Sequence, residues 1–374
     1  MSYSDFVQER LLTPLGMRDT TASGARFEGS KDLATPYATL NERSAYELTQ
    51  PAVRDGTILA AAQGLRITAP DLIKWGIALL QAAKYEQAHD SQACPNLPLR
   101  HASKQLSSHV VRIAGLREKS YALGFYRNEL PTQFEGLGCN SMFVEEMPTV
   151  ASREGNPIVL THGGSMADYH TFLALISHLD IVFVVLTNSI ALADPAGWIN
   201  QYLIETIIDS PVKNDYVRLA EDAAQGHVDS CLHIFKELEE QRVPDLPAKS
   251  PSAYIGIYKD ASLPSYIHVV EGSSSPLQIV FQGLASQAWD LNHYQGDTFL
   301  FLASRDEQAR RALFTFAGRD DFKIIFEPNA EDELVSLLWP ADPNLPNEVQ
   351  RFERVSDHTV LENGGNGNSQ LNKG

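Results

Sequence analysis

Three short apolar runs between residues 157 and 187 constrain the fold more than any other feature of the sequence. The runs PIVLTHGG, TFLALIS and IVFVVLT are rich in β-branched and apolar residues, but each is too short to span a membrane. Residues 177–180 separate the last two runs as a hairpin turn would. The pattern predicts three consecutive antiparallel strands, and the alternating run YALGFYR at 121–127 predicts a further strand.

Helices are expected beside these strands. One begins after Thr68, which can cap its amino-terminal end, with Pro70 at the favoured first helical position. Another covers residues 194–209, has Asp194 as its N-cap, and is expected to cover the sheet. A shorter amphipathic helix is predicted over residues 4–12, capped by its first residue, Ser4.

The periodicity of the sequence changes after residue 251. Residues 215–242 have the spacing of a helical pair or one long helix, and prolines at 244, 247 and 251 mark a boundary because proline stops helices and stiffens linkers. Beyond them come seven short strand-like runs separated by turn residues: YIGIY, YIHVV, LQIVF, WDLNHY, TFLFL, ALFTF and KIIFE. We expect a mixed domain at 1–212, a connector and linker at 213–251, an all-β domain at 252–355, and a disordered polar tail at 356–374.

Composition excludes several classes of protein. The formal net charge of −17, without clusters of Lys and Arg, argues against nucleic acid or an anionic membrane surface as a partner. The three cysteines fit neither a disulfide framework nor a zinc site, and the N-terminus lacks the features of a secretory signal. We therefore expect a cytoplasmic protein without metal or cofactor; the sequence predicts no oligomeric state.

Four separated segments carry a family resemblance: FVQERLLTPLGMRDT, AAAQGLRITAPDLIKWGIALL, LTHGGSMADYHTF and IVFVVLTNS. In this order they resemble the serine β-lactamase and penicillin-binding-protein superfamily, in its esterase and transesterase branch, over residues 1 to about 210. The C-terminal part is similar to the lipocalin-like appendage of many fungal members, often encoded beside natural-product biosynthetic genes. The resemblance implies an α+β fold: a partial β-lactamase/transpeptidase-like antiparallel sheet flanked by helices, plus an all-β barrel.

The same resemblance assigns roles to the end of the first apolar run. His162, Gly163 and Gly164 match the third family motif, a Lys-Thr-Gly or His-x-Gly strand that lines the acyl site. The imidazole can hydrogen-bond or help to hold a developing anion, and the two glycines let a substrate approach the backbone. The backbone N–H of Ser165 would be the second oxyanion donor. Tyr169 would wall the pocket, or be a half-buried aromatic in a turn.

The first two family motifs, Ser-x-x-Lys and Tyr-x-Asn, precede the matched segments in relatives and are therefore expected upstream of Met1. Ser210 and Lys213 have the first spacing, but proline follows the serine, so no helical turn can bring the lysine to its hydroxyl. Tyr126-Arg127-Asn128 matches the second motif only literally, because it follows a strand-like run.

Other candidate residues have structural explanations. Residues 163–167 nearly spell the Gly-x-Ser-x-Gly nucleophile elbow, but a hairpin pattern follows instead of a helix, so Ser165 is retained only as a backbone donor. His170 and His178 are expected at the surface or as caps, and His268 and His293 lack metal-ligand spacing. Asp168 follows the third motif without an assigned role.

Three functions remain open from the sequence. The first is a serine hydrolase or acyltransferase acting on an ester, lactone or amide of a small molecule through an acyl-enzyme, which requires the upstream motifs. The second is a catalytically inactive remnant or ligand-binding module. The third is a non-covalent acid–base cyclase or isomerase in which His162 polarises a carbonyl.

Overall fold

The computed structural model describes residues 1–27, 32–51, 53, 57, 59–90, 92–134, 136, 138–166, 169–313, 318–340 and 349–355. The chain forms two units. Unit 1 contains Met1–Ser230 together with Gln308–Phe314, and unit 2 contains Cys231–Glu307 together with Thr315–Gly374. The domain boundaries expected from the sequence remain predictions, and the expected tail at 356–374 lies outside the described residues.

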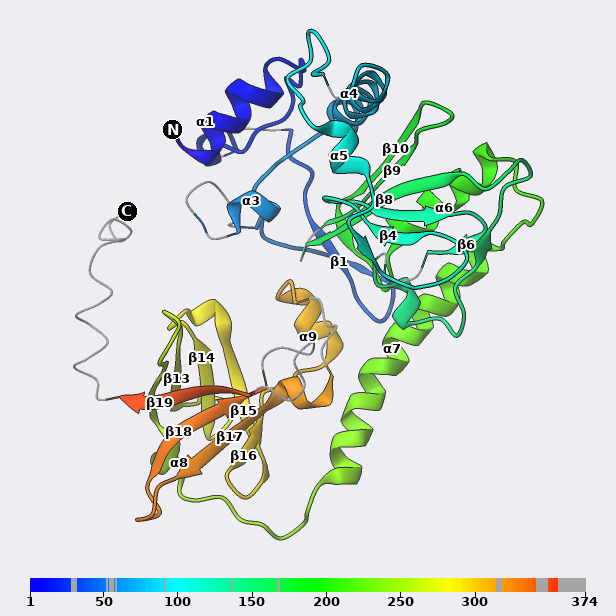
Figure 1. Ribbon diagram of the computed structural model, residues 1–374. Helices are drawn as coiled ribbons and strands as arrows, with labels where there is room; N and C mark the ends of the chain where they lie inside the picture. Colours follow the sequence, from blue (N-terminus) through cyan, green and yellow to red (C-terminus); the bar gives the residue numbers. More distant parts are fainter. Residues whose placement is uncertain are drawn as a thin grey trace. The chain divides into compact units, whose positions relative to one another are not determined.

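Unit 1 is built on a six-stranded sheet with the order β10-β9-β8-β5-β4-β3, in which all neighbours are antiparallel (Figure 1). The three strands predicted from the apolar runs are confirmed and lie side by side. The strands are β3 (Val110–Val111), β4 (Lys119–Tyr121), β5 (Tyr126–Glu129), β8 (Ile158–Met166), β9 (Tyr169–Ile176) and β10 (Ile181–Thr187).

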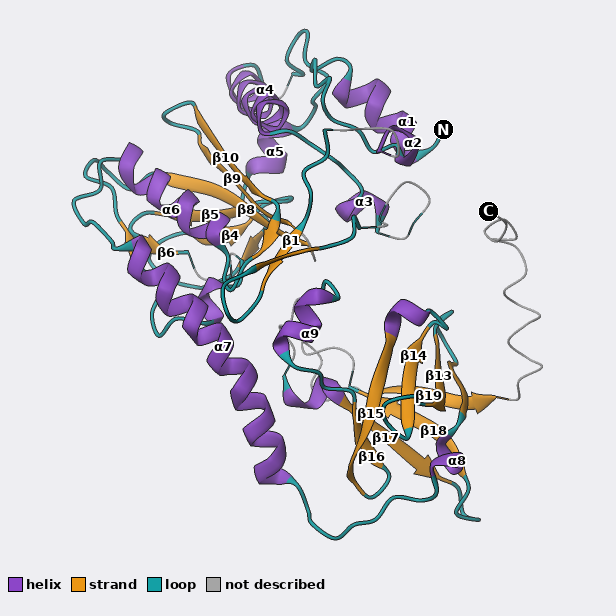
Figure 2. Cartoon of the chain, turned by 180° about the vertical axis from the view of Figure 1, so that it is seen from behind, coloured by secondary structure: helices purple, strands orange, loops and turns teal. Residues whose placement is uncertain are grey.

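Alternate residues of these strands supply two different cores. Leu160 of β8 and Leu175 of β9 pack with Leu79 of helix α4 (Ala69–Ala88) on one face of the sheet. Val159 and Phe172 pack on the other face with residues of helix α6 (Pro195–Ile207), and Figure 2 shows the helices on both sides of the strands. This period-two exchange between two buried faces explains why the runs are apolar almost throughout.

The two longer predicted helices begin as their sequences indicate. The Thr68 side chain accepts a hydrogen bond from the Asp71 N–H at the start of α4, and Asp194 caps α6 through the Gly197 N–H. Each cap satisfies a backbone donor that would otherwise lack an intrahelical partner. The remaining described elements of unit 1 are short: α2 (Gly24–Phe27), β1 (Tyr37–Thr39), β2 (Ala45–Glu47), α3 (Ala60–Gln63), α5 (Ala102–Leu106), β6 (Thr132–Gln133), η2 (Asn140–Met142), β7 (Thr149–Val150) and β11 (Ser189–Ile190).

Two local predictions were wrong. The first helix, α1 (Tyr3–Val7), is capped by Ser2 rather than Ser4 and continues as the π-helix η1 (Gln8–Leu12), so Phe6 is 52% exposed. The run YALGFYR is not one strand, because Gly124 takes a positive φ of 91° and turns the chain between β4 and β5. Glycine adopts this conformation readily, which the alternation of apolar residues did not reveal.

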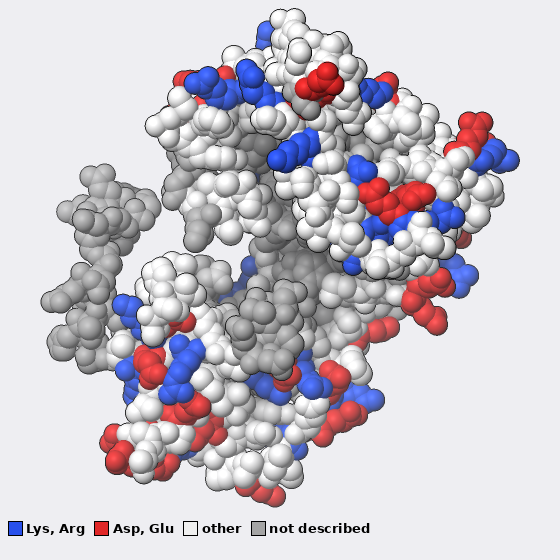
Figure 3. All heavy atoms as spheres, in the orientation of Figure 1, with Lys and Arg blue, Asp and Glu red and all other residues white. Residues whose placement is uncertain are grey.

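Helix α7 (Tyr216–Gln241) is one long helix that begins in unit 1 and ends in unit 2. Unit 2 also contains α8 (Pro251–Tyr254), η3 (Ala285–Gln287), η4 (Arg319–Phe322) and the first half of α9 (Arg305–Arg310). None of the helices in the described ranges combines the length and the apolar character needed to cross a membrane. Figure 3 shows basic and acidic side chains intermingled over the visible face of the residues that it colours.

The strands of unit 2 form a closed eight-stranded antiparallel barrel, because β12 pairs with β19 as well as with β13. Aromatic side chains fill its interior: the ring of Tyr254 lies 4.7 Å from that of Phe299 and 4.8 Å from that of Phe326. The strands are β12 (Gly256–Asp260), β13 (Tyr266–Glu271), β14 (Leu277–Phe281), β15 (Ala288–Gln295), β16 (Thr298–Leu300), β17 (Lys323–Pro328), β18 (Leu334–Trp339) and β19 (Gln350–Val355).

The barrel corrects the strand list expected from the sequence. The run ALFTF at 312–316 is not a strand at its first two residues, and residues 314–317 lie outside the described residues. The two strands missing from the prediction are β18 and β19. In β19, QRFERV, Phe352 is the only large apolar side chain that is buried, and the charged residues beside it conceal the alternation.

Candidate functional site

Strand β8 carries the residues that the sequence singled out. His162 and Ser165 are exposed, whereas Gly163 and Gly164 are half-buried within the strand. Residues 160–166 pair in regular register with β9, so that His162 lies opposite Leu173 and Ser165 opposite His170. Ser165 therefore lies within a hairpin, and not at the strand–turn–helix junction that a nucleophile elbow requires.

The pairing on the other edge of β8 fixes the direction of its backbone groups. The Leu130 N–H donates to the Pro157 carbonyl at 3.0 Å across the β5 edge, and β5 begins at Tyr126, which pairs with Thr161. Every second residue of an antiparallel strand points its N–H and C=O to the same side. The backbone groups of Gly163 and Ser165 therefore point towards the β5 side.

That edge of β8 is open beyond the end of β5. Within the part of the chain that the structure describes, no strand pairs with it after Thr161. The outward N–H groups at this end of β8 are fixed because β9 pairs with β8 from Leu160 to Met166. Such preorganised donors can stabilise a negatively charged oxygen without reorganising.

The imidazole of His162 lies beside an aromatic and cationic stack. Its ring centroid is 6.2 Å from that of Tyr126, and the Arg112 guanidinium lies 4.5 Å from the Tyr126 centroid. The surrounding protein atoms lower the pKa of His162 below its ordinary value, and a hydrogen bond involving the Gly163 backbone opposes this effect. The ring is therefore mainly neutral at pH 7 and has a nitrogen that can accept a hydrogen bond.

The two glycines of β8 differ in the space around them. A Cβ atom on Gly163 would make ordinary contacts with the backbone N of Gly138 and the Phe172 ring, at 3.6 and 3.7 Å. A Cβ atom on Gly164 would overlap the hydroxyl of Thr171 on β9. Close packing against Thr171 therefore explains why residue 164 is a glycine. The neighbours of residue 163, in contrast, leave room for a side chain.

A buried polar cluster that the sequence did not predict lies next to this strand. Asn140 in η2 and Asp194 are joined by two hydrogen bonds, and the Asp194 Oδ1 atom is 3.5 Å from the Nδ1 atom of His170. His170 is buried, so its expected position at the surface or as a cap is wrong. Gly138 approaches Asp194 so closely that a Cβ atom there would overlap the carboxylate. The N-cap signal identified Asp194, but nothing in the sequence indicated its partners.

Tyr169 lies at the start of β9 and is half-buried. Its hydroxyl lies within hydrogen-bond distance of the Ala34 carbonyl, at 2.8 Å, and of Gln50 Oε1, at 2.9 Å. The side chain thus ties the segment before β1 and the segment after β2 to the β8–β9 hairpin. A contact between Tyr169 and a substrate remains a prediction, and Asp168 lies outside the described residues.

The residues that match Ser-x-x-Lys and Tyr-x-Asn only in spacing have structural roles. The Ser210 hydroxyl donates to the Val212 carbonyl just after α6, outside any helix. Tyr126 and Asn128 lie on β5, as the strand interpretation requires, and Asn128 is buried there. In the described residues, no group of three or more His, Cys, Asp or Glu side chains could hold a metal ion, and His178, His268 and His293 belong to no such group.

Comparison with families of known proteins gives two matches. The model of the beta-lactamase family matches residues 1–200, which is more than half of the chain. The model of a domain of unknown function, DUF3471, matches residues 240–354, the part that contains the barrel. No curated protein matches the chain in a sequence search.

Two solved structures with detectable similarity have low sequence identity to this chain. The octameric penicillin-binding protein homologue from Pyrococcus abyssi is 14% identical, with a TM-score of 0.40, and the match covers 95% of this chain and 59% of that protein. A class C beta lactamase from Rhodobacter sphaeroides is 16% identical, with a TM-score of 0.35, and the match covers 62% of this chain and 55% of that enzyme. The chain therefore spans less than two thirds of the length of either protein.

Proposed function

Because this chain belongs to the beta-lactamase family, we propose that unit 1 provides the oxyanion-binding strand of a serine hydrolase or acyltransferase. The substrate would be an ester, lactone or amide of a small molecule, attacked by a serine that residues 1–374 do not provide. The observation that carries the proposal is the open edge of β8, towards which the Ser165 N–H points. A tetrahedral intermediate places its negative oxygen against N–H groups of this kind.

The four predicted site residues of β8 each have a role in this proposal. The Ser165 N–H holds the oxyanion, and Gly163 lets the substrate lie against the strand, since its own neighbours leave room for a side chain. His162, largely neutral at pH 7, accepts or donates a hydrogen bond to the reacting group. Gly164 keeps β8 and β9 closely packed. The resemblance to fungal members with a lipocalin-like appendage supports a place in natural-product biosynthesis.

The test joins residues 1–374 to a candidate upstream segment that contains Ser-x-x-Lys and Tyr-x-Asn. Reaction of the joined protein with a fluorophosphonate probe then measures acylation of the serine. The expected product is an adduct on the upstream serine. Ser165→Pro removes the N–H, and proline is tolerated there because the N–H points to the unpaired edge of the strand. This variant should slow acylation by about 10²–10³-fold. Ser165→Ala keeps the N–H and should acylate at nearly the original rate.

Two results would overturn the proposal. One is an adduct on Ser165 itself in residues 1–374, abolished by Ser165→Ala, because Ser165 would then be the nucleophile. The other is equal acylation of the Ser165→Pro and Ser165→Ala variants, because the N–H would then hold no oxyanion.

A second candidate function is a ligand-binding module without turnover. It is favoured by the sequence itself, in which Ser210 is the only serine followed three residues later by lysine, and the structure places that serine outside any helix. Residues 1–374 that bind a small ester but release it unchanged would support this alternative.

A further inference from the structure

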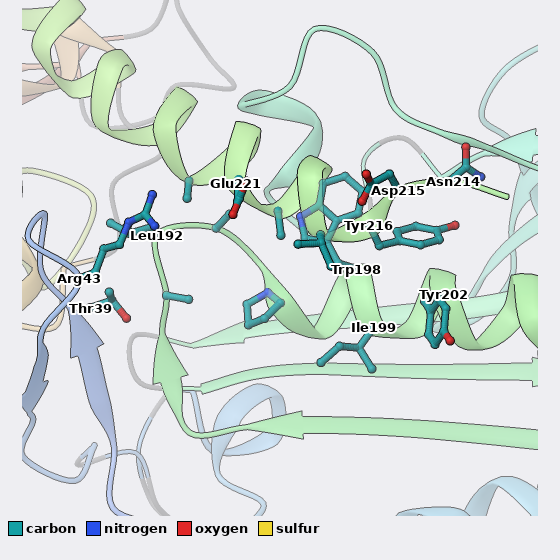
Figure 4. Close-up of a pocket in the computed structure, with 16 residues that line it drawn as sticks. Thr39, Arg43, Leu192, Trp198, Ile199, Tyr202, Asn214, Asp215, Tyr216 and Glu221 are labelled. Atoms are coloured by element: carbon teal, nitrogen blue, oxygen red, sulfur yellow. The ribbon is translucent and has the colours of Figure 1, made fainter.

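A cavity of about 810 Å³ lies in unit 1 away from the residues of β8. It is bounded by α6, by the amino-terminal turns of α7 and by the segment at 191–193, with Thr39 and Arg43 at one end (Figure 4). No residue of β8, β9 or β5 lines it. Its size is that of a site for a small organic molecule. The reaction proposed at β8 involves none of the residues that line it.

The walls of this cavity are apolar and aromatic. Trp198 and Tyr202 project from α6, and Tyr216 is the first residue of α7, with ring centroids 6.3 Å apart for Trp198 and Tyr216 and 6.0 Å apart for Tyr202 and Tyr216. Ile199 and Val217, at the edge, are 45% and 73% exposed. These side chains would lose contact with water if an apolar molecule occupied the cavity.

Trp198 adds a polar group to the apolar wall. The side chain is only 3% exposed, and its Nε1–H is buried without a hydrogen-bond partner among the described residues. Buried indole N–H groups usually have a hydrogen-bond partner, so the cavity wall contains one donor whose hydrogen bond is not made by the described residues.

The charges around the cavity favour a cation. Asp215 and Glu221 line it together with a single basic residue, Arg43. The Asp215 carboxylate accepts the Arg218 N–H and so offsets the positive partial charge at the start of α7. Below the wall, the Tyr216 hydroxyl donates to the buried carboxylate of Glu205, which adds further negative charge.

We propose that this cavity binds a small organic cation, an ammonium group carried on an apolar body. The aromatic faces of Tyr202 and Tyr216 and the carboxylate of Asp215 would receive the ammonium group, since a cation is attracted both to ring faces and to carboxylates. The apolar body would lie along Trp198 and Ile199. Figure 4 shows Tyr202 and Arg43 at opposite ends, so the ammonium group would bind at the end remote from the one basic residue.

The test uses three probes of matched length: 4-phenylbutylammonium, 4-phenylbutanol and 5-phenylpentanoate. Titration of the full chain is followed by calorimetry and by the fluorescence change of Trp198, assigned with Trp198→Phe. The ammonium compound should bind at least about threefold more tightly than the alcohol and about tenfold more tightly than the carboxylate.

Variants locate the bound cation. Tyr202→Ala and Asp215→Asn should each weaken binding of the ammonium compound by about threefold, while Tyr202→Phe, which keeps the ring, should bind nearly as the original chain does. Arg43→Asn removes the only basic charge in the lining and tolerates the φ of 65° at this position, so it should tighten binding. Glu9→Gln removes an exposed acid that does not line the cavity and is the matched charge control.

Thermal unfolding curves confirm that each variant is folded before its binding is compared. Tighter binding of the carboxylate, with loss of that binding in Arg43→Asn, would overturn the proposal in favour of an anion site. It would also be overturned if the folded chain bound none of the probes at millimolar concentration, or if Tyr202→Ala and Glu9→Gln had equal effects.

Discussion

Asn140 and Asp194, 54 positions apart in the sequence, are joined by two hydrogen bonds of 2.8 Å. The Asn140 amide donates to the Asp194 carbonyl, and the Asp194 N–H donates to Asn140 Oδ1. Both residues are almost completely buried, so the Asp194 N–H depends on the asparagine, whereas the Asp194 carbonyl also accepts the Trp198 N–H at 3.4 Å. The pair ties the start of α6 to the loop that connects β6 to β7, next to β8.

Replacement of Asn140 tests this connection. Asn140→Ala leaves the Asp194 N–H buried without its partner, at a cost of about 1–3 kcal/mol, while the Asp194 carbonyl keeps the Trp198 N–H as a donor. We expect the free energy of unfolding, measured by urea titration of unit 1 signals, to fall by about 1–3 kcal/mol. Gln81→Ala, at an exposed position of α4, should change it by less than about 0.5 kcal/mol. A similar loss in both variants would mean that the pair is not a specific tether.

Two glycines that lie close together should respond differently to an added methyl group. Gly138 has a positive φ of 70° and would overlap Asp194, so Gly138→Ala should destabilise the protein by at least about 2 kcal/mol. Gly163→Ala makes only ordinary contacts and should leave the thermal midpoint nearly unchanged, although it narrows the approach to β8. Equal thermal midpoints for the two variants would contradict this account of the packing.

His162 should titrate below its ordinary pKa of 6.5, because the surrounding protein disfavours the charged ring. The folded protein then binds fewer protons than the unfolded chain between the lowered pKa and 6.5. The contribution of His162 to stability is therefore complete above pH 6.5 and is lost as the pH falls through this window. NMR titration of the ring, assigned by the signal missing in His162→Gln, measures the pKa. A value above 6.5 would show that the hydrogen bond dominates.

Tyr216 and Tyr202 provide a matched pair of hydroxyl deletions. Tyr216→Phe removes the 3.0 Å hydrogen bond to the buried carboxylate of Glu205, which also holds Asn214, and should cost about 1–3 kcal/mol of unfolding free energy. Tyr202 is more than half exposed, so Tyr202→Phe should be close to neutral. Chemical denaturation of both variants distinguishes the hydrogen bond from the general effect of losing a hydroxyl group.

The barrel should be sensitive to loss of its internal rings. Phe326 is buried and lies within 6 Å of the rings of Tyr254, Tyr258 and Phe299. Phe326→Ala should destabilise unit 2 by about 3–5 kcal/mol, because it removes buried apolar surface and leaves a cavity. The near-ultraviolet circular dichroism of the barrel aromatics follows this transition. Leu263→Ala, at an exposed position, should leave it unchanged.

Much of the fold could be predicted from local sequence. The apolar runs at 157–187 predicted β8, β9 and β10, and the capping residues Thr68 and Asp194 predicted where α4 and α6 begin. These features depend on neighbours within a few residues, so the chain encodes them directly. Strand β19 was missed because its inward residues are sparse among charged ones, and β4 and β5 were merged because one glycine decides the turn.

By itself, the sequence determined which residues line the end of β8 and that a histidine, two glycines and a serine follow one another there. Only the tertiary structure decided what these residues face. Pairing with β5 stops at Thr161, no other described strand pairs with the outer edge beyond it, and the Asn140–Asp194 pair forms from segments 54 positions apart. The aromatic cavity between α6 and α7 likewise depends on how two helices meet. Such relationships are set by long-range packing, and no local pattern of residues specifies them.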